Sequence, residues 1–328
     1  MMLPLRHIVN TINRVTSRFF LALVIIGMGS GLLLPDRVAD FAVILPYVLA
    51  LIVFAMGTSC TVDSFRAIIL SPKGFLTALF VVFVLMPLIG YLIGLLFYSG
   101  DPELLLGHLL MAVTPVAITS VVWTGIAGGN IALSIALVTV ATLVSGASIP
   151  GLLSLYAGAV VEFDALTLVG NLSKTIVLPA LLGLLVRNRL PRITESSKPY
   201  VDLVSKLGMI SVLVVNGVAL KPIVGRLGWG MAGLILIVAI HVLANFATGL
   251  AVSSLILGRR NPSVTAVMYS SSMRNNAAGL VIATNYFSPA VSLPVIGCMI
   301  VQHFWAGVFL RIVGGRREGV PKTPGAPP

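Results

Sequence analysis

Long apolar runs recur along the whole of this chain and leave it few ways to fold. Ten such runs are separated by short polar connections. Most reach the length of about 17–25 residues that an α-helix needs to cross a bilayer, and their continuity disfavours a β-barrel, whose strands alternate. The sequence therefore predicts an all-α membrane protein with ten transmembrane helices. The runs are 19–34, 41–56, 75–97, 104–127, 131–155, 166–185, 207–220, 229–257, 264–283 and 290–313.

The composition excludes the soluble classes of protein. Hydrophobic residues make up 58% of the chain and charged residues only 9%, whereas soluble domains carry about 25% charged residues. A cytosolic enzyme, a nucleic-acid-binding protein and a disordered chain are all incompatible with these values. The two cysteines, Cys60 and Cys298, form neither a disulfide framework nor a zinc pattern.

The net charge of +11 is explained by topology. If both termini are cytoplasmic and the runs alternate in direction, sixteen of the 21 Lys and Arg residues fall on the inner side. This bias follows the positive-inside rule. We therefore expect a multi-pass protein of the plasma (inner) membrane, with transporter residues 1–313 and a disordered cytoplasmic tail at 314–328.

The ten runs divide into two sets of five, and the two sets cross the membrane in opposite directions. This arrangement is typical of transporters built from inverted repeats. The fourth and ninth runs correspond, and both are interrupted, at Thr114-Pro115 and between Ser270 and Asn276. Broken helices in matching positions indicate a binding site near the membrane midplane.

Arg274 lies about 15 Å into the ninth run, at 1.5 Å per residue, which is too deep for its charge to reach water easily. A charge at this depth indicates function. One reading is that an anionic substrate neutralises it; the alternative is a guanidinium held by backbone carbonyls that locks the helix break. Neighbouring hydroxyl and amide groups complete the candidate substrate- or ion-binding set: Thr119, Ser120, Ser134, Ser270, Ser271, Ser272, Arg274, Asn275 and Asn276.

The other polar residues within the runs are expected to serve structure. Lys174 is expected to extend toward the outer surface. His108, His241 and His303 are expected to be packed, hydrogen-bonded histidines, and their separation in the sequence matches no metal site. No paired acids lie within the runs, so a membrane-embedded enzyme remains only as the alternative of another class.

Several segments together resemble the bile acid:sodium symporter family. Phe54-Ala55-Met56-Gly57 and the following Val62-Asp63-Ser64-Phe65 resemble its signature after the second helix, and the segment from Ala127 to Ser134 resembles A-x-G-D-x-A-L-S. The resemblance covers nearly the whole chain. It implies a panel domain of helices 1, 2, 6 and 7, a core domain of helices 3–5 and 8–10, and unwound helices 4 and 9 that cross in the core. Family substrates are mainly organic anions, including bile acids and small carboxylates.

The chain departs from this family at the residues that bind two sodium ions. Ser120, Ser134 and Asn275 look like matches. Val121 and Val138 stand where the resemblance implies Asn and Thr. Ser270 and Arg274 stand where it implies Glu and Gln. Because a fixed cation would repel a nearby ion strongly, we expect the guanidinium to replace one sodium.

The expected function is a secondary transporter that moves a small organic anion by alternating access, with sodium-independent or weakly coupled transport. The alternative within the family is a sodium-coupled bile acid or carboxylate symporter. No cofactor is expected. A bound sodium ion remains an alternative, although the departures from the family's sodium-binding residues argue against it. The expected partners are a small organic anion and the lipid bilayer, with no nucleic acid, and neither a metal site nor an oligomeric state is assigned.

Overall fold

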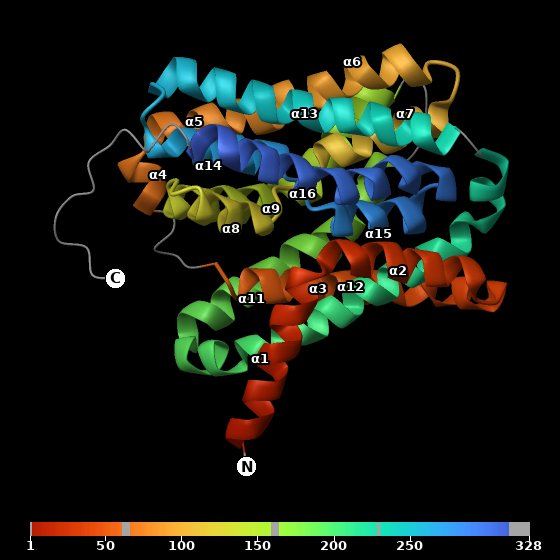
Figure 1. Cartoon of the computed structure of the whole chain (residues 1–328), viewed down its shortest axis with the longest axis horizontal. Helices are drawn as coiled ribbons and strands as arrows, with labels where there is room; N and C mark the ends of the chain where they lie inside the picture. Colours follow the sequence, from red (N-terminus) through yellow and green to blue (C-terminus); the bar gives the residue numbers. More distant parts are fainter. Residues whose placement is uncertain (1, 61–65, 159–163, 228–229, 315–328) are drawn as a thin grey trace.

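The computed structural model describes residues 2–60, 66–158, 164–227 and 230–314 (Figure 1). Throughout this part of the chain the regular secondary structure is helical, and the one extended pairing is an isolated bridge between Val116 and Arg274. The all-α prediction is confirmed.

Seven helices among the described residues are long and apolar enough to cross a membrane. Several of these segments join elements of different helical type. They are Asp36–Gly57 (η1 Asp36–Ile44, α3 Leu45–Gly57), Pro72–Tyr98 (α5 Pro72–Phe80, η3 Val81–Leu85, α6 Met86–Tyr98), Ile131–Ala157 (α9), Ala165–Arg189 (α10 Ala165–Leu172, η4 Ser173–Val177, α11 Leu178–Arg189), Pro191–Pro222 (within α12 Pro191–Leu227), Gly230–Leu257 (α13) and Pro289–Val313 (η5 Pro289–Val291, α16 Ser292–Gly314).

The other three predicted runs coincide with shorter helices. The first is α2, Phe20–Leu33, with 14 residues. The fourth is divided into α7, Pro102–Val113, and α8, Thr119–Ile126. The ninth is divided into α14, Pro262–Ser272, and α15, Asn276–Tyr286. The two interruptions that the sequence predicts are therefore present in the structure.

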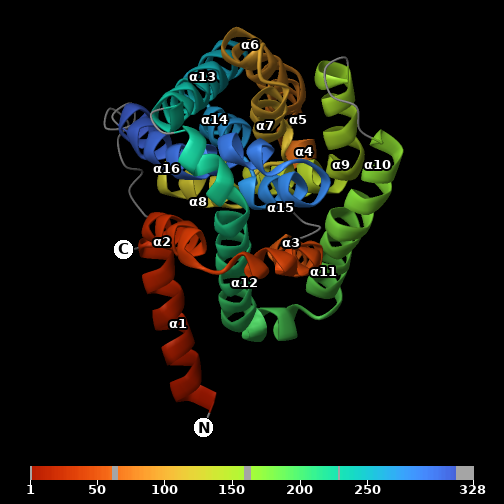
Figure 2. The ribbon, with the colours of Figure 1, turned by 90° about the vertical axis from the view of Figure 1, so that its right-hand side faces the viewer.

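The helices form two groups, which both views separate (Figures 1 and 2). We call α2, α3, α11 and α12 the four-helix layer, and α5 to α9 with α13 to α16 the main bundle. In Figure 2 the layer lies below the bundle, and α10 rises beside α9 at the edge where the two groups join. The short helix α4, Arg66–Leu70, precedes α5.

Glycine contacts join the helices of the four-helix layer. A Cβ built on Gly31 of α2 would lie 2.9 Å from the Cα of Gly217 on α12 and would overlap the carbonyl oxygen of Val214. A Cβ built on Gly57 of α3 would lie 3.1 Å from the Cα of Gly183 on α11. Small residues let the backbones of membrane helices approach closely. The same device therefore joins α2 to α12 and α3 to α11.

Two helical segments extend beyond the predicted runs. α1, Met2–Arg18, is a separate helix that projects from the four-helix layer (Figures 1 and 2). It is amphipathic: Ile8, Ile12 and Val15 share an exposed face, while Arg14 lies on another. A search for continuous apolar runs passes over such a helix, because its apolar residues are spaced at 3.6-residue intervals.

α12 begins at Pro191, sixteen residues before the predicted start of the seventh run at 207. Its first turns carry charged residues, so the hydropathy pattern places the boundary too late. At the other end of the chain, Gly314 is the last residue of α16 rather than the first of a tail, and the rest of the predicted tail lies outside the described residues. Lys174, in η4, is exposed.

Candidate functional site

The two helix breaks cross inside the main bundle and pair with each other. The backbone N–H of Ala117 donates to the carbonyl of Met273 at 3.0 Å, and that of Asn275 donates to the carbonyl of Pro115 at 2.8 Å. Pro115 explains why the first segment is extended, since a residue before proline avoids the helical region. Backbone groups freed by breaking two helices thus satisfy one another, as a low-dielectric interior requires.

Arg274 lies at the centre of this crossing and is 2% exposed. Its guanidinium donates to the carbonyl of Thr114 through Nη1 and to the carbonyl of Val82 through Nη2, each at 3.1 Å. Thr114 is the C-cap residue that follows α7, and Val82 lies in the π-helical turn η3. The guanidinium therefore links the two helix breaks to η3. This arrangement corresponds to the alternative given in the sequence analysis, in which backbone carbonyls hold the guanidinium and lock the helix break.

Gln302 of α16 supports the crossing from the other side, and the sequence analysis missed it. Its Oε1 accepts from the backbone N–H of Arg274 at 3.1 Å and from Asn276 Nδ2 at 3.3 Å. A lone glutamine in an apolar run gave no spacing signal that could have singled it out. Asn275 caps the second half-helix, because its Oδ1 accepts from the N–H of Ala278 at 3.3 Å.

We expect Gln302→Met to destabilise the protein. Methionine has nearly the same shape but leaves the two donors without their acceptor, and each buried unsatisfied group costs about 1–3 kcal/mol. Thermal unfolding in detergent should show a lower melting temperature. The matched control is Asn285→Leu in α15, whose amide donates only to the carbonyl of Val281 in its own helix. Equal losses in both variants would contradict a special role for Gln302.

Three of the predicted serines meet in a fully buried hydroxyl cluster. Ser134 Oγ of α9 lies 3.4 Å from Ser120 Oγ and 3.0 Å from Ser270 Oγ. Thr124 donates to the same oxygen at 3.4 Å. Four hydroxyl groups thus gather around one point, and no carboxylate of the described residues bonds to them. Ser271 and Ser272 do not join them, since Ser271 donates to the carbonyl of Met268 in its own helix.

A cavity of about 450 Å³ lies between the crossing and the four-helix layer. Thr119, Arg274, Asn275 and Asn276 line it from the main bundle, whereas Ser120, Ser134 and the three serines of 270–272 do not. α3 and α12 supply the opposite wall. The residues contributed by these two helices are Ile52, Ala55, Met56, Lys198, Asp202, Ser205, Lys206 and Met209, with Ser59 following α3.

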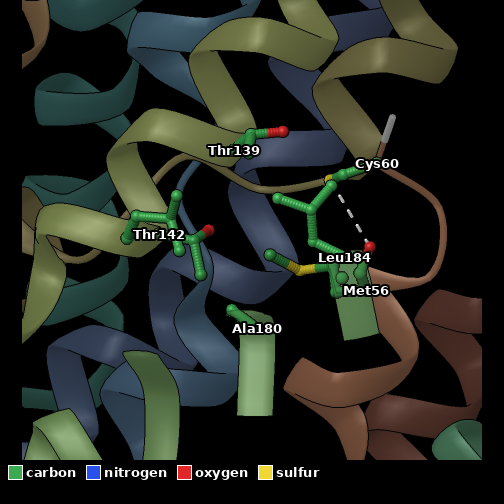
Figure 3. Close-up of a pocket in the computed structure, with 8 residues that line it drawn as sticks. Met56, Cys60, Thr139, Thr142, Ala180 and Leu184 are labelled. Atoms are coloured by element: carbon green, nitrogen blue, oxygen red, sulfur yellow. Dashed lines mark hydrogen bonds between the residues drawn. The ribbon is translucent and has the colours of Figure 1, made fainter. Parts of the chain in front are cut away.

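A second pocket, where the end of α3 meets α9 and α11, is too small to hold a metabolite (Figure 3). Its volume is about 10 Å³, which is about that of one water probe. The hydroxyls of Thr139 and Thr142 donate to their own helix, and Cys60 Sγ donates to the carbonyl of Met56 at 3.5 Å. We take the 450 Å³ cavity as the candidate substrate site, because it is lined by residues of the broken-helix crossing.

Comparison with protein families decides the class of this molecule. Residues 46–226 match the model of the Sodium Bile acid symporter family. The chain belongs to this family. The resemblance found in the sequence is thus confirmed, and the chain is a multi-pass membrane transporter rather than an enzyme.

Three relatives illustrate the range of the match. The uncharacterized protein YbaS of Bacillus subtilis (strain 168) is 30% identical over 284 residues, which cover 85% of this chain and 91% of YbaS. The uncharacterized sodium-dependent transporter YocS of the same organism is 27% identical over 75% of each chain. The probable sodium/metabolite cotransporter BASS2, chloroplastic, of Oryza sativa subsp. japonica is 27% identical over 80% of this chain and 62% of that protein.

Proposed function

We propose that this protein is a secondary transporter that moves a small organic anion by alternating access. The observation that carries the proposal is the cavity between the broken-helix crossing and the four-helix layer. A site between two groups of helices can open to either side of the membrane when one group moves against the other. The four-helix layer with α10 would act as the panel, and the main bundle with α4 as the core, within residues 1–313.

The arrangement of the layer supports inverted repeats of five helices. The first, second, sixth and seventh predicted spans include residues of α2, α3, α11 and α12, respectively. If the first five spans correspond to the second five, α2 corresponds to α11 and α3 corresponds to α12, so the contact between α2 and α12 corresponds to the contact between α11 and α3. Both pairs meet at a glycine–glycine contact, Gly31 with Gly217 and Gly183 with Gly57. The two broken helices correspond as well. This symmetry favours ten crossings, and the bias of Lys and Arg residues toward one side then places both termini in the cytoplasm of an inner-membrane protein.

The charges and dipoles around the cavity favour an anionic substrate. α8 and α15 begin at the cavity wall, with Thr119 and Asn276 as their first residues. The N-terminus of a helix carries a positive partial charge. Lys198 and Lys206 add positive charge from α12 and outnumber Asp202. A small carboxylate fits this field and the cavity volume.

The crossing argues against obligatory sodium coupling. Sodium needs several oxygen ligands, and a carboxylate among them would offset the cost of dehydrating the ion. The hydroxyl cluster around Ser134 has no carboxylate, and the guanidinium of Arg274 already binds the carbonyls that a cation would otherwise bind. We therefore propose that Arg274 takes the place of one sodium ion. The alternative is a sodium-coupled symporter, which the names of YocS and BASS2 favour.

Counterflow tests the transporter function directly. The first step is a thermal-shift screen of small organic anions, and the second is exchange of the best binder in proteoliposomes. We expect anion on the far side of the membrane to accelerate uptake, because an alternating-access carrier returns faster when loaded. A channel would show no such acceleration, and that result would contradict the proposal.

A pair of tryptophan variants on α3 tests the cavity itself. Ile52→Trp fills the cavity and is expected to reduce counterflow by about tenfold or more, since buried ligand sites are closely matched in volume. Leu51→Trp is the matched control, because Leu51 is the adjacent residue, is 44% exposed and does not line the cavity. Equal activity of the two variants would place the substrate route elsewhere.

A further inference from the structure

Two histidines that are far apart in the sequence form a buried pair inside the main bundle. His241 Nδ1 of α13 lies 2.9 Å from His108 Nε2 of α7, and the ring centroids are 4.7 Å apart. Both side chains are fully buried. We call these residues the histidine pair. The sequence analysis treated each of them singly and could not foresee their contact.

Glycines of α6 make room for the histidine pair. A Cβ built on Gly90 would lie 3.1 Å from Cε1 of His241 and 2.6 Å from the Cβ of Ala112. A Cβ built on Gly94, one turn later, would lie 2.7 Å from Leu105 and 3.8 Å from Cδ2 of His108. The backbone of α6 therefore runs against the edges of both rings, and the pair is held in a closely fitted space.

The ring nitrogens of the histidine pair leave one lone pair free to bind a proton. A neutral imidazole has one donor and one acceptor nitrogen. The inner bond uses one of each, so one outer nitrogen carries a hydrogen and the other a lone pair. Neither His108 Nδ1 nor His241 Nε2 has a hydrogen-bond partner among the described residues. A proton taken up by the lone pair gives an imidazolium that shares its inner hydrogen with the second ring.

A polar side chain lies at each end of the histidine pair. Tyr98, the last residue of α6, has its ring centroid 5.5 Å from that of His108, and its hydroxyl is buried without a partner among the described residues. Asp101, which caps α7, is exposed, and its backbone N–H donates to the carbonyl of Tyr98 at 3.0 Å. At the other end of the pair, the carboxamide of Asn245 approaches His241 from one turn along α13.

Few charged groups reach the histidine pair. Complete burial is the main factor that opposes a positive charge on His241, and the charges of His108 and Arg274 oppose it further. Tyr98 faces the pair from α6. The helices α5, α6, α9 and α13 to α16 contain no Asp or Glu, and the two acids at the start of α7, Asp101 and Glu103, are exposed. A proton on the pair would therefore be felt mainly by the guanidinium that holds the crossing together.

We propose that the histidine pair is the proton site of this carrier, and that one proton moves with each anion. The inference rests on the transporter function proposed above. The proton enters from water, binds the outer lone pair of the histidine pair and leaves as the same proton on the other side, with no other bond made or broken. Its charge repels Arg274 and loosens the guanidinium from the carbonyls of Thr114 and Val82, which links proton uptake to the helix crossing.

Nitrogen-15 NMR of the purified protein, labelled at histidine, tests proton binding without any substrate. Because burial opposes the charged form, the pH is lowered from about 8 to well below the usual titration range of histidine. The outer pyridine-type resonance of the pair is then expected to disappear and a low-field N–H···N proton to persist. His108→Gln and His241→Gln should each remove the N–H···N proton, and His7→Gln, at an exposed position of α1, should leave it. A pair that keeps its pyridine-type nitrogen throughout would overturn the proposal.

Proteoliposomes test whether that proton drives transport. With the anion chosen by the thermal-shift screen, one coupled proton predicts net uptake that rises by up to about tenfold for each unit fall in external pH, with acidification of trapped pyranine. His108→Gln should abolish this acceleration, whereas His7→Gln should keep it. Titration in the NMR spectrum without acceleration of uptake would contradict the coupling role. If no anion is exchanged, that result contradicts the proposed transporter function. The NMR titration tests proton binding by the histidine pair independently of that outcome.

Discussion

Arg274→Gln is expected to destabilise the protein by about 2–4 kcal/mol. The substitution removes two charge-assisted hydrogen bonds, each worth about 1.5–3 kcal/mol in soluble proteins and less in membranes. It also leaves the carbonyls of Thr114 and Val82 unpaired at the crossing of the two broken helices. The melting temperature in detergent should fall, and anion counterflow should be lost with it.

The control for this variant is Arg311→Gln, which removes an exposed arginine near the end of α16. We expect no measurable change in melting temperature there. A second variant tests the idea that the guanidinium stands in for a cation. Ser270→Glu combined with Arg274→Gln restores the residue types that the family resemblance implies, and sodium should then raise its melting temperature. An Arg274→Gln protein as stable as the wild type would contradict the locking role.

Gly31→Val is the second substitution for which we expect a large effect. Its side chain would enter the backbone of α12, where a Cβ alone already overlaps the carbonyl oxygen of Val214. Overpacking of a close helix contact costs about 1–3 kcal/mol, and more where backbone must move. α2 and α12 should separate, with a lower melting temperature and a loss of transport from a deformed panel.

The matched control lies two residues away on the same helix. A Cβ at Gly29 meets no atom within 4 Å, so Gly29→Val should change stability by about 0.5 kcal/mol or less. The inverted symmetry adds a further expectation: Gly183→Val should behave like Gly31→Val, and Gly170→Val in α10, also in open space, should behave like the control. Equal melting temperatures for Gly31→Val and Gly29→Val would show that the close contact does not hold the layer together.

The sequence predicted those parts of the fold that depend on hydropathy and on helix breakers. Apolar runs gave the membrane helices, and Pro115 and the polar segment from Ser270 to Asn276 gave the two interruptions. Amphipathic segments escaped the same analysis. α1 and the first turns of α12 carry charges, so a search for continuous apolar residues passed over α1 and placed the start of α12 too late.

The candidate site was predictable only in its individual residues. An arginine far from either end of an apolar run is visible in a sequence, but its two carbonyl partners are not, because every residue has a carbonyl. Gln302 and the contact between His108 and His241 depend on helices brought together by the fold. Ser271 and Ser272 were predicted with their neighbours, yet the helical turn places both outside the hydroxyl cluster and the cavity.

The central claim is that a fixed guanidinium occupies the place of a coupling sodium ion. It is tested most directly by uptake of the anion identified in the thermal-shift screen into proteoliposomes of the wild-type protein. Sodium is compared with choline as the sole monovalent salt, at the same pH on both sides. The account predicts equal initial rates in the two salts. Uptake that stops when sodium is replaced by choline would contradict it.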